Sequence, residues 1–268
     1  MRIGTQEFNT KENTYIMGIL NVTPDSFSDG GKYQNMDAAL YKAEEMIKDG
    51  ADILDIGGES TRPGYIPVSE EEEMERVLPV VEAIKERFEI PVSVDTYKSS
   101  VAEAAILSGA DLINDIWGLK ADEKMAGVIA KHQVACCLMH NRNHMDYVNF
   151  MEDMRSDLME SIALAQKAGI EGDKIILDPG VGFAKSYEQN LEAIRDLEKI
   201  IELGYPVLLG TSRKSVIGLT LNLPSEERME GTLVTTVAAV AQGAAFVRVH
   251  DIKENARAIK MAQAIYHR

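Results

Sequence analysis

Short apolar runs rich in β-branched residues alternate with longer amphipathic segments along the whole chain. This alternation is typical of parallel βα units and not of hairpins or helix bundles. Strands are predicted at residues 15–21, 51–56, 91–95, 110–115, 134–140, 174–178, 206–210 and 244–250. Three of them follow a glycine, at Gly50, Gly109 and Gly243, which suits the left-handed residue that ends a helix.

The segments between the strands carry helix signals. Ser69 and Glu72 have capping-box spacing, and residues 157–168 and 188–203 repeat apolar positions at the period of a helix. No Pro-rich or Ser/Gly-rich linker divides the chain. The sequence therefore predicts a single (β/α)8 TIM barrel spanning residues 1–268, in which residues 1–13 form a short extension that closes the barrel floor. A doubly wound open sheet is the alternative, disfavoured because no Gly-x-Gly-x-x-Gly follows the first strand.

Composition narrows the possible functions. The 268 residues are 45% hydrophobic and carry 28 Lys and Arg against 43 Asp and Glu, a net charge of −15. So acidic a chain repels nucleic-acid phosphates and anionic lipid, so we expect neither as a partner. The adjacent Cys136 and Cys137 lie in an apolar run and read as core residues of a reduced compartment. With no apolar leader in residues 1–13 and no run near the ~18 residues of a membrane span, the expected location is the cytoplasm.

Polar residues gather where the predicted strands end, which is the active-site face of a barrel. These strand ends are Asn21, Asp55, Asp95, Asn114 with Asp115, His140, Asp178, Gly210 and Arg248 with His250. One Asp or Asn at a strand end usually caps a turn, so the inference rests on the set. Desolvating so many polar groups at one mouth is costly unless they bind something.

The residue types indicate the ligand. Asp95, Asn114 and Asp178 with a lysine suit a planar heterocycle that presents N–H donors and carbonyl acceptors, such as an aminopyrimidine, although a Mg²⁺ or Ca²⁺ site uses the same types. Residues 211–215, with Arg248 and His250, are cationic in an acidic chain and follow the last two strands, where barrels bind phosphate. The long loops after the first two strands, 22–31 and 59–65, are candidate lids.

Five segments together resemble bacterial dihydropteroate synthase, a family of pterin-binding TIM barrels. They are 21–31 (NVTPDSFSDGG), 57–64 (GGESTRPG), 177–183 (LDPGVGF), 210–215 (GTSRKS) and 248–251 (RVHD). The resemblance implies a cytoplasmic homodimer and sulfonamide target. It also implies that the enzyme joins (7,8-dihydropterin-6-yl)methyl diphosphate to 4-aminobenzoate, giving 7,8-dihydropteroate and diphosphate for folate synthesis.

Carried over position by position, the resemblance implies a role for each site residue. The pterin ring is assigned to Asp95, Asn114, Asp178 and Lys214. The diphosphate is assigned to Arg248 and His250, with Thr61 reaching the substrate, and Lys214, Arg248 and His250 are the expected catalytic residues. The 4-aminobenzoate site is assigned to Phe27, Thr61, Pro63, Phe183, Lys214 and Ser215. Mg²⁺ is expected on a single protein ligand, Asn21, because the ion keeps several waters and is held chiefly by substrate phosphates.

Two alternatives remain open at this point. A corrinoid-type pterin-binding methyltransferase domain shares the barrel and the pterin pocket, but it lacks a reason to keep Lys214 and the loop that holds Phe27. A non-catalytic homologue that binds a pterin without turnover is the other. Residues 139–145 (MHNRNHM) depart from the pattern of many relatives, which leaves His140 and His144 without an assigned role.

Overall fold

The computed structural model describes residues 1–22, 32–59 and 67–266. Eight parallel strands form one sheet in the order β8-β7-β6-β5-β4-β3-β10-β9. A parallel bridge between Leu177 and Val207 joins β8 to β9 and closes the sheet into a barrel. The strands are β3 Tyr15–Asn21, β4 Ile53–Gly57, β5 Val92–Asp95, β6 Leu112–Asp115, β7 Ala135–Met139, β8 Ile175–Asp178, β9 Leu208–Leu209 and β10 Phe246–Val249.

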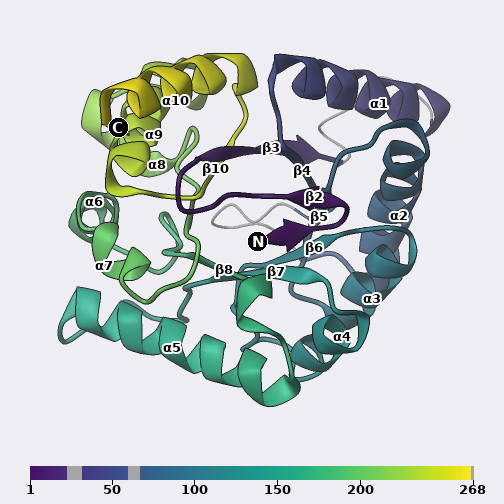
Figure 1. Cartoon of the computed structure of the whole chain (residues 1–268), viewed down its shortest axis with the longest axis horizontal. Coiled ribbons are helices and arrows are strands. Elements are labelled where there is room, and N and C mark those ends of the chain that lie inside the picture. The colour runs from purple at the N-terminus through teal and green to yellow at the C-terminus, as the bar shows by residue number, and fades with distance from the viewer. Residues whose placement is uncertain (23–31, 60–66, 267–268) are drawn as a thin grey trace.

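Helices surround the strands as an outer ring (Figure 1). They are α1 Lys32–Asp49, α2 Glu70–Arg87, α3 Ser99–Leu107, α4 Met125–His132, α5 Phe150–Ala168, α6 Tyr187–Arg195, α7 Glu198–Ile201, α8 Ser215–Leu221, α9 Met229–Gln242 and α10 Ile252–Tyr266, with short 3-10 turns η2 Gly172–Lys174 and η3 Ser225–Glu227. The predicted (β/α)8 barrel is confirmed. One predicted helix, 188–203, is wrong because Asp196 leaves helical geometry at φ −108° and ψ 30°, so α6 and α7 are separate. Aspartate is a poor residue for a helix interior.

The predicted helix ends are present. Ser69 Oγ accepts a hydrogen bond of 3.1 Å from the Glu72 N–H at the start of α2. Gly50, Gly109 and Gly243 have φ angles of 106°, 110° and 92°, the left-handed region expected after a helix. These glycines turn the chain directly into β4, β6 and β10, so they set where each of those strands begins.

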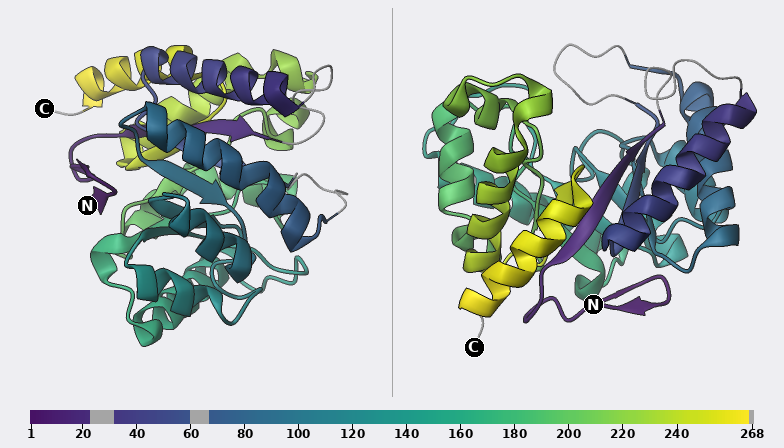
Figure 2. Two further views of the ribbon diagram at one scale, coloured as in Figure 1. Left: turned by 90° about the vertical axis from the view of Figure 1, so that its right-hand side faces the viewer. Right: turned by 90° about the horizontal axis from the view of Figure 1, so that it is seen from above.

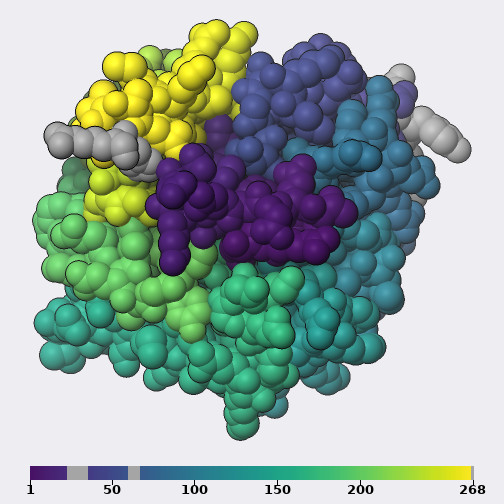
Figure 3. All heavy atoms as spheres, in the orientation of Figure 1, coloured from purple at the N-terminus to yellow at the C-terminus, as the bar shows by residue number. Residues whose placement is uncertain are grey.

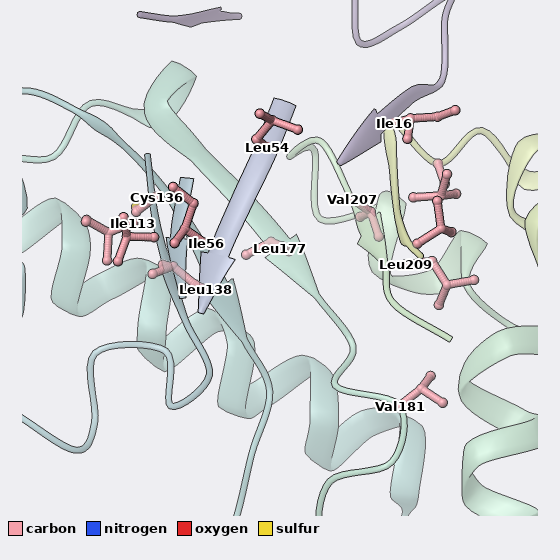
Figure 4. Close-up of a cluster of buried hydrophobic side chains, with 14 of the residues drawn as sticks. Ile16, Leu54, Ile56, Ile113, Cys136, Leu138, Leu177, Val181, Val207 and Leu209 are labelled. Carbon is pink, nitrogen blue, oxygen red and sulfur yellow. The ribbon is translucent and has the colours of Figure 1, made fainter. Parts of the chain in front are cut away.

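Side chains alternate between two apolar layers along each strand. Leu54, Ile113, Cys136 and Leu177 belong to the cluster that packs outward under the helices (Figure 4). Their neighbours Ile53, Leu112, Cys137 and Ile176 belong to a separate cluster inside the barrel. Both cysteines are fully buried, in agreement with their predicted role as core residues. This alternation matters for function because the next inward position on each strand lies at the barrel mouth.

The N-terminal extension covers the opposite end of the barrel. Strands β1 Arg2–Ile3 and β2 Gln6–Glu7 form an antiparallel hairpin, seen across the centre of the face in Figure 3 and beneath the barrel in Figure 2. Ile3 is fully buried among the strand starts. The Phe8 ring lies 4.8 Å from Tyr15 and 5.7 Å from Phe246, measured between ring centroids. The prediction that this extension closes the floor is confirmed. Within the described ranges, we find no helix with the length and apolar character needed to cross a membrane.

Candidate active site

The polar layer at the mouth follows from the period of the strands. Inward positions come two residues apart, so Asp55 follows Ile53, Asn114 follows Leu112, Asp178 follows Ile176 and Arg248 follows Phe246. Strand register then aligns these polar ends: Asp95 is paired with Asn114, Gly57 with Asp95, and Asn21 with Gly57. The predicted strand-end residues are therefore gathered at one end of the barrel, above its apolar interior.

Asp55 is the centre of a buried hydrogen-bond network in this layer. Its side chain is fully buried, and its Oδ2 accepts from Arg248 Nε at 2.6 Å and from Asn114 Nδ2 at 3.3 Å. Ser93 Oγ donates to its Oδ1 at 2.5 Å. The sequence predicts Asp55 as a strand end without assigning it a role. The period-2 pattern that starts at Ile53 is the sequence signal that places it inward.

Arg248 bridges two carboxylates. Besides Asp55, it donates from Nη2 to Asp95 Oδ2 at 2.7 Å. Although burial disfavours its charge, Asp55 and Asp95 raise the pKa of Arg248 above its usual value. The sequence predicts this guanidinium at the diphosphate. In the structure it lies against the acidic side chains assigned to the pterin, so the cationic and acidic parts of the site are interleaved.

Asp95 keeps one acceptor open. Its Oδ1 is buried and has no hydrogen-bond partner in the described structure. Burial raises the pKa of Asp95 to about 7, while Arg248 opposes this shift. Burial also raises the pKa of Asp178, whose Oδ1 accepts from the Gly180 N–H at 2.7 Å. A buried acceptor without a partner is costly, and a ligand N–H donor would remove that cost.

Lys214 meets the loop that follows β8. Its Nζ donates to the Val181 carbonyl at 2.5 Å and lies 4.9 Å from the centroid of the Phe183 ring. Burial lowers the pKa of Lys214 to about 8. Gly210 lies beside this pair, because a Cβ there would lie 3.7 Å from Asp178 Oδ2 and 3.8 Å from Lys214 Nζ, both ordinary van der Waals distances.

The loop before α8 joins the end of β10. Ser212 Oγ lies 2.9 Å from His250 Nδ1 and accepts from the His250 backbone N–H at 3.2 Å. The neighbouring Arg213 makes an ion pair with Asp251, with Nη2 to Oδ1 at 2.5 Å. Its charge is therefore already compensated. Ser215 is the exposed first residue of α8, as expected from its place in the sequence.

Two predicted strand-end groups point away from the mouth. The Asp115 carboxylate accepts from the backbone N–H groups of Trp117 at 2.8 Å and Leu119 at 2.7 Å, which is a turn-capping role. His140 directly follows β7 at a position that faces outward, and its Nε2 lies 2.9 Å from Asp157 Oδ2 on α5. Burial lowers the pKa of His140 to about 4, so the ring is neutral near pH 7.

Asn21 is the sole predicted metal ligand. A Cβ at Gly57 would lie 3.5 Å from Asn21 Oδ1 and 3.8 Å from Asp95 Cβ, so the amide stands at the mouth beside the acidic layer. No group of three or more His, Cys, Asp or Glu suited to a metal occurs in the described parts of the chain. One hard oxygen donor fits Mg²⁺ only if substrate phosphates and water complete its shell. Phe27, Thr61 and Pro63 lie outside the described residues.

The arrangement suits binding more than nucleophilic attack. Both cysteines are buried below the mouth, and burial raises the pKa of each thiol far above neutrality. The groups that do face the mouth are acceptors for N–H donors, together with Arg248, Lys214 and His250 as groups that can neutralise an anion.

Comparisons with known proteins identify the family. Residues 17–250 match the family described as pterin binding enzyme. The dihydropteroate synthase of Clostridium beijerinckii is 63% identical, and the match covers 100% of both chains. A structure of the dihydropteroate synthase of Clostridium difficile, solved in the presence of pteroic acid, has a TM-score of 0.96 and 50% identity and covers 98% of this chain and 100% of that one. That of Xanthomonas albilineans with 4-aminobenzoic acid has a TM-score of 0.91 and 40% identity, covering 96% and 94%. The chain therefore belongs to the dihydropteroate synthase family of pterin-binding enzymes.

Proposed function

We propose that this protein condenses (7,8-dihydropterin-6-yl)methyl diphosphate with 4-aminobenzoate, yielding 7,8-dihydropteroate and diphosphate. The observation that carries the proposal is the open acceptor of Asp95 beside Asn114, within a buried polar layer that also contains a guanidinium. This layer complements a ring with several N–H groups and an anionic substituent. The relatives with pteroic acid and 4-aminobenzoic acid support the same substrate pair.

The pterin ring would lie against Asp95, Asn114 and Asp178. Carboxylates accept from the ring N–H and amino groups, and the Asn114 amide adds a donor for the ring carbonyl. Because these side chains come from three neighbouring or facing strands of a closed barrel, their positions are fixed before the ligand arrives. The apolar layer beneath them, including Cys137 and Ile176, provides a dry base for the ring.

In the reaction, the bond between the pterin methylene carbon and the diphosphate oxygen breaks, and a bond from that carbon to the aromatic amine nitrogen forms. The leaving group takes the bonding electron pair, and the amine loses one proton to solvent. Cleavage running ahead of attack needs stabilisation of the departing charge, which Arg248 and His250 would supply. When bound, Mg²⁺ would neutralise phosphate charge further, with Asn21 as its protein ligand.

The amine would approach from the side of Phe183 and Lys214. The ring of Phe183 offers an apolar face to 4-aminobenzoate, and the neighbouring ammonium offers a charge to its carboxylate. With Ser215 at the start of α8 near the carboxylate, Thr61 and Pro63 of the second loop and Phe27 of the first, this surface would define the second substrate site.

We also propose that the protein forms a homodimer through α8, α9 and α10, of which α9 contacts both of the others on one side of the barrel (Figure 1). Leu219, Val234, Met261 and Ile265 on these helices are 68%, 69%, 63% and 57% exposed. Large apolar side chains in this number on adjoining helices are typical of an interface. Sedimentation equilibrium at several concentrations tests the stoichiometry.

The decisive experiment is a coupling assay. Purified protein, pterin diphosphate and 4-aminobenzoate are incubated with and without Mg²⁺, and 7,8-dihydropteroate is separated by chromatography. Product that requires both substrates supports the proposal. If calorimetry shows pterin binding while the assay yields no product, the chain is a non-catalytic pterin-binding homologue instead.

A further inference from the structure

A buried lysine lies behind the active-site loop that follows β8. Lys185 is 8% exposed, and the proposed reaction assigns it no role. Its Nζ lies 2.9 Å from the Gly180 carbonyl, 3.0 Å from the Phe183 carbonyl and 2.9 Å from His140 Nδ1. Burial lowers the pKa of Lys185 to about 7, and in its protonated form the group has three N–H donors, one for each of these acceptors.

The position of the proton on the His140 ring follows from its contact with Asp157. Although burial opposes it, hydrogen bonds from His140 and Arg142 lower the pKa of Asp157, so this carboxylate is an acceptor only. Arg142 Nε donates to Asp157 Oδ2 at 2.5 Å, and His140 Nε2 meets the same oxygen at 2.9 Å. The histidine proton therefore belongs on Nε2, which leaves Nδ1 as the acceptor for Lys185.

The backbone of the loop after β8 has an unusual conformation. Gly180, Gly182 and Ala184 have φ angles of 67°, 90° and 44°, three left-handed residues within five. A Cβ at Gly180 would lie 2.0 Å from the His140 carbonyl oxygen. Alanine in this region is strained, so the conformation needs external support. Tyr147 adds to that support, since its hydroxyl donates to the Ala184 carbonyl at 2.9 Å.

The same loop forms one wall of the active site. Its Val181 carbonyl accepts from Lys214, and its Phe183 ring lies beside the same ammonium. Lys185 therefore donates to the backbone carbonyls of this loop at Gly180 and Phe183. The same loop contacts Lys214 through the Val181 carbonyl and the Phe183 ring, so it sets the positions of Lys214 and Phe183. Lys185 reaches the substrates only through these groups.

We propose that Lys185, held by His140, is a positioning residue that fixes the loop after β8 so that Phe183 and Lys214 together form the 4-aminobenzoate site. The inference rests on the proposed function. It also gives His140 a role, as the acceptor that holds the lysine ammonium in place.

The test compares three variants and a control in the coupling assay. Lys185→Met removes all three donors while keeping the aliphatic stem. His140→Leu removes the acceptor, whereas His140→Gln retains one amide oxygen toward Lys185 and one N–H toward Asp157. The control is Lys85→Met, because Lys85 makes a 2.8 Å ion pair with Asp111 at the start of β6, at the other end of the barrel.

Lys185→Met and His140→Leu should raise the KM for 4-aminobenzoate at least ~10-fold, equal to about 1.4 kcal/mol, with a smaller change in pterin diphosphate binding by calorimetry. His140→Gln and Lys85→Met should stay near the wild-type KM. Amide hydrogen exchange of residues 180–184 should accelerate in the first two variants alone.

The outcomes separate the two proposals. Wild-type protein that makes no product refutes the proposed function. Active wild-type protein with an unchanged KM and unchanged loop exchange in Lys185→Met overturns the positioning role. If Lys185→Met does not fold, the comparison of His140→Leu with His140→Gln decides, and equal KM values for that pair contradict the inference.

Discussion

Replacing Asp55 by asparagine perturbs the buried centre of the polar layer. The substitution conserves shape and leaves one oxygen acceptor, but it removes the charge that faces Arg248 at 2.6 Å. Ser93 and Asn114 also lose the carboxylate to which they donate. Arg248 keeps its contact with Asp95, so the guanidinium is left with one carboxylate in place of two.

The expected loss of stability follows from the hydrogen bonds that the Asp55 carboxylate accepts. A hydrogen bond to a charged group contributes about 1.5–3 kcal/mol, so the free energy of unfolding should fall by an amount in that range. Arg248 also loses the contact that fixes its Nε, and with it the alignment of the ligand groups. We therefore expect kcat/KM for the pterin substrate to fall at least ~10-fold, which corresponds to about 1.4 kcal/mol of transition-state stabilisation.

The matched control is Asp52→Asn. Asp52 lies just before the same strand and accepts one backbone N–H, from Ile16, at 2.7 Å, but it does not face the mouth. Urea unfolding gives the stability of both variants, and initial rates at saturating 4-aminobenzoate give kcat/KM. If Asp55→Asn matches Asp52→Asn in both quantities, Asp55 does not organise the site and the reasoning from its contacts is refuted.

Three further predictions concern other parts of the molecule. Lys214→Ala should reduce kcat/KM by at least ~100-fold, about 2.7 kcal/mol, without unfolding the barrel, and near-normal rates would contradict its placement. The pKa is about 7 for Asp95 and about 8 for Lys214, so kcat/KM should rise with pH as Asp95 ionises and fall as Lys214 loses its proton. If the rise with pH persists in Asp95→Asn, its assignment to Asp95 is contradicted. Phe8→Ala should lower the free energy of unfolding by ~3–5 kcal/mol in urea while kcat/KM stays unchanged, because the floor lies far from the mouth; a loss of activity at full stability would contradict this.

Much of the fold was accessible from the pattern of the sequence. Strand and helix alternation predicted the barrel, and Gly50, Gly109 and Gly243 marked three helix ends because their φ angles favour glycine. The break at Asp196 was missed, because apolar spacing continues through it and a local change of backbone leaves no trace in periodicity.

Part of the set of side chains at the mouth was predictable, whereas their pairing was not. Polar strand ends identified Asp95, Asn114 and Asp178, since the barrel places such residues at one mouth. Which side chains contact each other depends on strand register and side-chain reach. The sequence therefore did not reveal that Arg248 bridges Asp55 and Asp95, nor that Lys185 lies against His140.

The hairpin that covers the floor has a consequence for synthesis. Phe8 packs on Phe246, and Tyr15 of β3 is paired with Phe246 of β10. Phe8 and Tyr15 therefore cannot make these contacts until more than two hundred further residues have been synthesised. Until β10 emerges from the ribosome, one edge of β3 has no neighbour and the underside of the nascent sheet is open to water. Exposed strand edges and late long-range contacts favour association with other chains. Nascent chains that end before β10 should therefore associate with other chains more readily than the complete protein does.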